Sequence, residues 1–130
     1  MRMRTVVISL AIVTVFSLPA LAAIVGFNQQ QWNNVVGSCD ILGQHYRETS
    51  GNIGTALTRE VGNTCYRLGV RWSWYHEDFG WMENQKTSLA FQTEVRNDLG
   101  GITSIGWTRH RGSVIPNGQS EQWSTWRQIP

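Results

Sequence analysis

The sequence predicts an all-β fold, a small antiparallel β-sandwich or barrel-like domain with one disulfide. Apolar and polar residues alternate strictly from Cys65 to Tyr75, which is typical of a strand with one buried face. Similar short segments recur, with turn-forming residues about every ten positions. Two cysteines follow an apparent export signal, and an oxidising destination favours their pairing.

The first residues have the pattern of a cleaved signal peptide. Arg2 and Arg4 precede an almost unbroken apolar run from Val6 to Leu18, and Ala20-Leu21-Ala22 fits a small-x-small cleavage site. We therefore predict export, with a secreted or periplasmic location. An uncleaved membrane anchor is the alternative, because apolar residues continue as far as Val25.

Cleavage would remove residues 1–22 and leave one domain, residues 23–130, that is close to neutral. The whole chain has a formal charge of +2, but Arg2 and Arg4 belong to the signal and all nine acidic residues follow it. Nonspecific phosphate binding needs several uncompensated positive charges on one face. Because the sequence has no basic run, we expect no nucleic-acid partner.

Cys39 and Cys65 are the only cysteines, and we predict a disulfide between them. A catalytic thiol and a metal ligand are the alternatives. Neither cysteine belongs to a C-x-x-C pair or lies near a histidine at ligand spacing, so both alternatives are weak.

The strand predicted from Cys65 to Tyr75 has two chemically different faces. One face carries Tyr66, Leu68, Val70, Trp72 and Trp74; the other carries Arg67, Gly69, Arg71, Ser73 and Tyr75. We expect Trp72 and Trp74 in the core. The arginines and tryptophans of this strand lie on opposite faces, so they cannot together hold a nucleic-acid backbone and stack its bases.

Other elements follow from the same patterns. Further strands are predicted over residues 54–61, 81–86, 89–95, 102–111 and 122–129. Turn-forming residues separate them at 62–63, 76–80, 96–101 and 112–118. The segment Phe27–Val36 is ambiguous, because its glutamines favour a helix whereas its asparagines and paired valines do not. We expect it to be irregular or a short helix.

The tripeptide His76-Glu77-Asp78 is the candidate catalytic site, in a small secreted hydrolase. Its three side chains could converge only in a loop, which is expected here. An ordinary polar loop is the simpler interpretation, because no nucleophile or second acid can be assigned to the site. His45, His76 and His110 lie more than thirty residues apart with no paired metal-binding spacing, and no phosphate loop or dinucleotide fingerprint is present. We therefore expect no metal and no cofactor.

Seven tryptophans are many for one small core, so we expect some of them to be exposed. The candidate binding residues lie at loop edges or on the polar side of predicted strands: Tyr75, Trp81, Trp107, Arg109 and Arg111. Exposed aromatic rings beside arginines suit a sugar, a peptide or a protein hot spot.

The preferred function is a secreted, non-enzymatic binding protein that engages a carbohydrate or a protein at a cell surface, as a toxin or an inhibitor for example. A small secreted hydrolase that uses the His76-Glu77-Asp78 loop is the alternative. No amphipathic helix is visible in the sequence, so we expect no membrane partner after the signal is removed.

Overall fold

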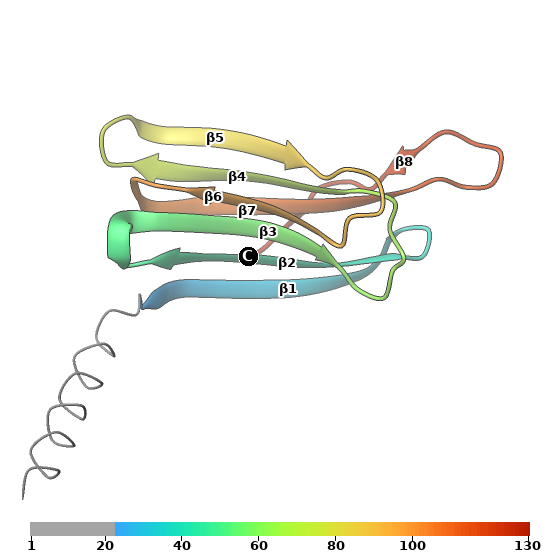
Figure 1. The fold of residues 1–130 in the computed structure, drawn as a ribbon, viewed down its shortest axis with the longest axis horizontal. Helices are drawn as coiled ribbons and strands as arrows, with labels where there is room; N and C mark the ends of the chain where they lie inside the picture. The colour runs from blue at the N-terminus through green and yellow to red at the C-terminus, as the bar shows by residue number, and fades with distance from the viewer. Residues whose placement is uncertain (1–22) are drawn as a thin grey trace, which may run out of the picture.

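A computed structural model describes residues 23–130 as two antiparallel β-sheets packed face to face (Figure 1). Sheet A has the strand order β1 (Ile24–Val36), β2 (Cys39–Glu48), β3 (Ile53–Glu60) and β6 (Glu94–Leu99). Sheet B has the order β5 (Gly80–Thr87), β4 (Leu68–His76), β7 (Ile102–Val114) and β8 (Gln122–Trp123), and β9 (Arg127–Gln128) also pairs with β7. A short 3-10 turn, η2 (Ser50–Asn52), joins β2 to β3. The predicted all-β fold is confirmed.

The predicted signal peptide over residues 1–22 lies outside the described residues. Within residues 23–130, no helix is long and apolar enough to cross a bilayer.

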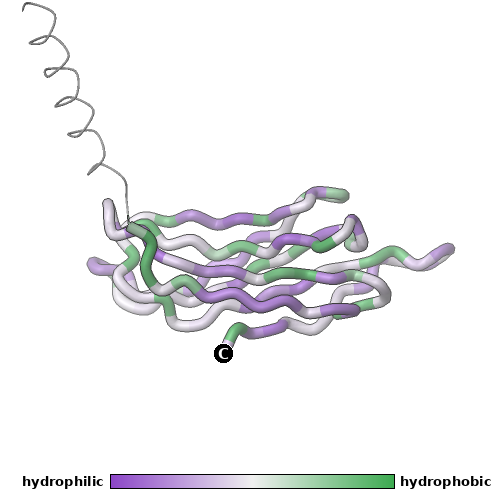
Figure 2. Tube along the Cα trace, turned by 90° about the horizontal axis from the view of Figure 1, so that it is seen from below, coloured by the Kyte–Doolittle hydropathy of each residue, from purple (hydrophilic) through white to green (hydrophobic). Residues whose placement is uncertain are grey.

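The core lies between the sheets, where the inward side chains of both layers meet. Hydropathy changes repeatedly from residue to residue along the strands, as Figure 2 shows. Trp72 is fully buried and Trp74 is 4% exposed, so their predicted place in the core is confirmed. Their rings pack together with centroids 4.9 Å apart. The other fully buried side chains of the apolar core are those of Cys39, Ile41, Ala56, Leu68, Val70 and Ile102.

The predicted disulfide between Cys39 and Cys65 is present, at one end of the sandwich. The bond packs against β7 at Gly112, where a Cβ atom would come within 2.4 Å of the Cys39 sulfur. Gly112 was expected to form a turn, and this expectation is wrong. The residue lies inside a strand, and glycine is needed there because the sulfur approaches the backbone so closely.

Folded, oxidised protein should contain no free thiol, because both cysteines are bonded to each other. The bond spans 26 residues, and closing a loop of this length stabilises a fold by about 3 to 4 kcal/mol in the chain-entropy model. Reduction should therefore lower the thermal midpoint without exposing a new activity. Alkylation followed by mass spectrometry tests the pairing; two labelled cysteines in folded, non-reduced protein would contradict it.

The segment Phe27–Val36, predicted to be irregular or a short helix, belongs to the edge strand β1. Its inward positions are largely polar, because Asn28 and Gln30 lie opposite His45 and Gly43 of β2. The hydrophobic alternation that marks a half-buried strand is therefore missing. Pairing with β2, a strand that was not predicted, overrides the weak local preference.

The prediction of a strand over residues 89–95 is also wrong, because β6 begins only at Glu94. The strand continues to Leu99 and pairs with β3, so most of the segment 96–101, predicted to be a turn, is strand. Leu89 is 73% exposed and Phe91 is 79% exposed, and both lie in the loop that precedes β6. Phe91 has a φ of 60°, which interrupts extended structure. The last predicted strand, 122–129, is divided into β8 and β9.

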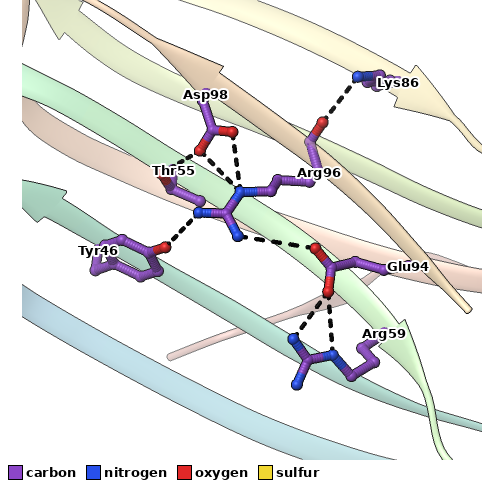
Figure 3. A network of polar contacts seen from close by, with 7 residues as sticks. All are labelled: Tyr46, Thr55, Arg59, Lys86, Glu94, Arg96 and Asp98. Atoms are coloured by element: carbon purple, nitrogen blue, oxygen red, sulfur yellow. Dashed lines mark hydrogen bonds and ion pairs between the residues drawn. The ribbon is translucent and has the colours of Figure 1, made fainter.

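The outer face of sheet A is covered by a network of paired charges (Figure 3). Arg59 contacts Glu94 at 2.8 Å, Arg96 contacts Asp98 at 2.9 Å, and Arg96 also donates a 2.7 Å hydrogen bond to the Tyr46 hydroxyl. Each arginine of this network therefore has an acidic partner, and the face carries little uncompensated charge.

A chain of buried hydrogen bonds crosses the core and fixes two histidines. The Thr58 hydroxyl donates to the Gly69 carbonyl oxygen at 2.8 Å, so its oxygen can accept a hydrogen bond from the Nδ1–H of His110 at 2.8 Å. The Nε2 atom of His110 then accepts from the Thr108 hydroxyl at 3.0 Å, whose oxygen accepts from the Nδ1–H of His45 at 2.8 Å. This assignment follows from the direction of the network and makes both imidazoles neutral.

Burial explains why these histidines remain uncharged. Burial lowers the pKa of His110 to about 3, and the nearby His45 acts in the same direction. Burial also lowers the pKa of His45. The ring of His110 lies directly on the backbone of Gly43, where a Cβ atom would be 2.5 Å from the ring carbon Cδ2. The site therefore leaves no room for a larger residue at position 43.

Candidate binding face on sheet B

The five predicted binding residues lie on one surface, the outer face of sheet B. Across the central strand β4, Tyr75 pairs with Trp81 of β5. Toward β7, successive outward positions of β4 pair with the other three candidates: Ser73 with Trp107, Arg71 with Arg109, and Gly69 with Arg111. We call this surface the tryptophan–arginine face; it comprises Arg67, Arg71, Tyr75, Trp81, Trp107, Arg109, Arg111, Trp123 and Trp126.

Trp81 is the most exposed tryptophan of this face, with 63% of its surface accessible. Its far edge reaches across β4 to Gly106 of β7, where a Cβ atom would be 2.8 Å from the ring carbon Cζ3. Tyr75 contacts the same indole edge to face, with centroids 5.6 Å apart. Gly106 lies at a register shift between β4 and β7, an irregularity of the kind that often re-aims side chains near functional sites. The indole is therefore exposed and held in place.

Trp107 lies beside two arginines. The guanidinium carbon of Arg109 is 4.0 Å from the centre of the Trp107 ring, and that of Arg71 is 5.6 Å away. Arg109 also donates from Nε to Gln128 at 3.1 Å, whereas Arg71 contacts Glu83 at 3.3 Å. These contacts orient both planar guanidinium groups over the sheet.

Arg111 lies between two indoles that the sequence did not identify as part of the site. Its guanidinium carbon is 4.2 Å from the centre of Trp123 and 4.3 Å from that of Trp126. Gly69 provides space for this arrangement, since a Cβ atom there would be 3.1 Å from Arg111 and 3.3 Å from Trp126. Burial lowers the pKa of Arg111, so its charge is poorly solvated.

Charges on this face are only partly compensated. Arg67 forms a bidentate pair with Glu121, and Arg71 contacts Glu83. Arg109 and Arg111 form no ion pair with any residue from 23 to 130. The two outer faces of the sandwich therefore differ, because the arginines of the network in Figure 3 are all paired with acids.

The structure corrects one reason for excluding nucleic acid. Along β4 alone, arginines and tryptophans do lie on opposite faces. The neighbouring strands, however, place Trp81 and Trp107 on the same side as Arg71. The pattern of polar and apolar residues within one strand could not reveal this shared face. Which side chains share a face across a sheet depends on which strands are neighbours and on their register. The sequence did indicate part of this shared face, because Trp107, Arg109 and Arg111 occupy alternate positions and so lie on the same side of one strand.

Of the candidate catalytic tripeptide, Glu77 and Asp78 lie in the tight turn between β4 and β5, as expected for a loop, whereas His76 is the last residue of β4 and pairs with Gly80. The Nδ1 atom of His76 accepts a 3.0 Å hydrogen bond from the backbone N–H of Asp78, and its ring packs against Phe79 with centroids 4.7 Å apart. The Glu77 carboxylate accepts from the Asn52 side chain at 3.4 Å. His45 and His110 lie in the core and do not join this turn. The His76 side chain thus stabilises the turn locally, and no hydrogen bond joins the side chains of His76, Glu77 and Asp78 in a catalytic relay.

Metal binding has no evident site in the described part of the chain. From residue 23 to residue 130, no group of three or more histidine, cysteine or acidic side chains is placed to hold an ion. Both cysteines are used in the disulfide.

Comparison with known proteins gives no relative from which a function could be transferred. The chain matches no protein-family model, no curated protein and no solved structure. The function must therefore be inferred from the chemistry of the tryptophan–arginine face.

Proposed function

We propose that the chain is an exported, non-enzymatic binding protein that holds a carbohydrate on the tryptophan–arginine face. One observation carries this function: the indole of Trp81 is largely exposed, yet Tyr75 and the space above Gly106 fix its position. A fixed, exposed ring loses little conformational entropy when a ligand packs against it.

The chemistry around Trp81 suits a sugar. A sugar ring has an apolar C–H surface that packs on an aromatic ring and a rim of hydroxyls that need hydrogen-bond partners. The neighbouring guanidinium groups of Arg71 and Arg109 supply several oriented N–H donors. An aromatic platform with polar groups beside it therefore complements both parts of the sugar.

The acids of the face favour binding over hydrolysis. Glycosidases generally use two carboxyl groups placed on either side of the scissile bond. Glu83 and Glu121 are the acids of this face, and each is paired with an arginine, Arg71 and Arg67 respectively. The Arg67 contact lowers the pKa of Glu121, so this carboxyl is a poor general acid at neutral pH.

Trp81→Ala should weaken carbohydrate binding by more than about 1 kcal/mol, about five-fold in Kd, while the thermal midpoint stays nearly unchanged. Phe79→Ala is the matched control, because Phe79 is equally aromatic and 73% exposed but lies at the turn beyond the face. Calorimetric titration against a glycan panel measures the effect. Gly106→Ala should produce a similar loss, since its Cβ would come within 2.8 Å of the Trp81 ring and within 2.5 Å of the Ser73 hydroxyl oxygen, so the ring would have to move.

Three results would contradict this proposal. Carbohydrate binding that survives both Trp81→Ala and Gly106→Ala would place the site elsewhere. A hydrolytic activity that is abolished by His76→Ala, but survives the loss of both Trp107 and Arg109, would support the hydrolase alternative instead. Capture of a protein ligand on the same face, with no glycan bound, would replace the carbohydrate by a protein partner.

A further inference from the structure

We propose that the tryptophan–arginine face is specific for an acidic polysaccharide, whose carboxylate or sulfate groups bind Arg109 and Arg111 while a sugar ring packs on Trp81. This inference rests on the proposed carbohydrate function and adds the chemical class of the ligand.

The first support is that Arg109 and Arg111 have few hydrogen-bond partners within residues 23–130. Arg109 hydrogen-bonds to the protein through Nε alone, and its other guanidinium nitrogens have no partner among residues 23–130. Arg111 forms no hydrogen bond to a described residue, and its Nε atom is both buried and unpaired. Unpaired guanidinium groups at a partly buried surface are stabilised when an anion arrives, because each gains charge-assisted hydrogen bonds.

The second support is that both guanidinium groups are held against aromatic rings before any ligand binds. Arg109 rests on Trp107 at 4.0 Å, and Arg111 lies between Trp123 and Trp126 at 4.2 and 4.3 Å. A planar guanidinium binds carboxylate or sulfate through two parallel hydrogen bonds when its plane is correctly oriented. The contacts with the indoles restrict both guanidinium groups and so reduce the entropy lost on binding.

The third support is the linear arrangement of the groups. Arg109 and Arg111 occupy alternate positions of β7, so their Cα atoms are roughly 7 Å apart, and Arg71 is the cross-strand partner of Arg109 at roughly 5 Å. The Trp81 ring, from β5, lies against Gly106 of β7, one residue before Trp107. A polymer that lies along β7 would therefore meet an aromatic platform first and then successive cations. Repeated acidic sugars fit this order better than a single monosaccharide does.

A single-stranded nucleic acid fits the same face less well. Successive bases need several open aromatic rings for stacking. Arginines lie over the rings of Trp107, Trp123 and Trp126, which are only partly exposed, so Trp81 and Tyr75 are the most open rings of this face. Two of the four arginines are also paired with glutamates, which lowers the positive charge available to a phosphate backbone.

The test compares the acidic form of each of two polymers with its neutral form, by affinity electrophoresis and calorimetric titration. Polygalacturonate is compared with its methyl-esterified form, and heparin with heparin that has been both desulfated and carboxyl-reduced; oligo-deoxythymidine is the third arm. We expect at least one acidic polymer to bind about ten-fold or more tightly than its neutral form. This preference should decrease as the salt concentration rises, because exposed charges are screened.

Arg109→Gln should weaken binding of the acidic polymer by about ten-fold and so remove most of the acidic preference; the neutral polymer, which loses only hydrogen-bond donors to its hydroxyls, should weaken much less. Arg111→Gln should act in the same direction. Arg59→Gln is the matched control, because it removes one positive charge from an exposed residue on the opposite face. The thermal midpoint of each variant is measured as a check on folding.

The outcomes separate this inference from the proposed function on which it rests. Equal binding of acidic and neutral polymers, lost in Trp81→Ala, would overturn the acidic specificity but leave carbohydrate binding intact. Oligo-deoxythymidine binding as tightly as the acidic glycan would also overturn it, because the face would then recognise polyanions in general. Absence of binding to any glycan would overturn both.

Discussion

Trp72→Ala should lower the free energy of unfolding by about 3 to 5 kcal/mol, the range found for large aromatic deletions in cores. Trp72 is fully buried on the central strand β4 and packs against Trp74. Its indole nitrogen has no hydrogen-bond partner within residues 23–130. The loss should therefore come from packing and from the cavity that remains. Denaturation by urea, followed by fluorescence, measures the change.

Arg71→Ala is the control for this prediction, because Arg71 is the next residue on the same strand but points outward. Its ion pair with Glu83 is exposed at 3.3 Å, and exposed pairs contribute about 0 to 1 kcal/mol. We expect a nearly unchanged denaturation midpoint. Equal, small effects of the two substitutions would show that β4 does not separate a buried face from an exposed one.

Acidification from pH 7 to about pH 4.5 should destabilise the fold by about 2 to 3 kcal/mol through His110 alone. The pKa of His110 is about 3 in the folded protein, against an ordinary value of 6.5. Below pH 6.5 the unfolded chain therefore binds a proton that the folded chain does not. The stabilising contribution is complete above about pH 6.5 and is lost progressively as the pH falls toward 3. The lowered pKa of His45 adds to the same trend.

The pH range chosen separates the histidines from the acids. The lowered pKa of Glu121 means that its contribution to stability is lost mainly below its ordinary value of 4.5. Urea unfolding at several pH values between 7 and 4.5 thus reports mainly on the histidines. A His110→Gln variant, although less stable, should lose much of the slope. A wild-type stability that is flat over this range would contradict a neutral, buried His110.

The sequence predicts the parts of this fold whose side chains alternate without interruption. From Leu68 to Trp74, every second residue is buried and apolar, so the strand and its core tryptophans can be recognised locally. The disulfide can be predicted as well, because the predicted export would lead to an oxidising compartment, where two cysteines have one simple pairing. Both features depend on the nearby sequence or on composition alone.

The remaining features depend on contacts between distant segments. β1 was not predicted because its inward positions are mostly polar and its partner β2 was not recognised. Leu89 and Phe91 resemble the buried face of a strand, yet they lie exposed in a loop because β3 pairs only from Glu94 onward. In the site, parity identified Trp107, Arg109 and Arg111. It could not show that Trp123 and Trp126 would surround Arg111, because that depends on the pairing of β7 with β8.

The position of the Cys39–Cys65 bond also bears on the order in which the strands can assemble. The ring that it closes contains β2 and β3 completely, and these strands pair with each other over eight positions. Contacts so close in sequence form early. If the chain is exported, as we propose, this hairpin can therefore be oxidised before the second half of the chain has crossed the membrane. The edge of β3 that pairs with β6 in the folded protein then has no partner strand until residues 94–99 are present. An unpaired edge of this kind is a template for other chains, so we expect slow or interrupted translocation to favour aggregation through β3 even when the disulfide has formed correctly.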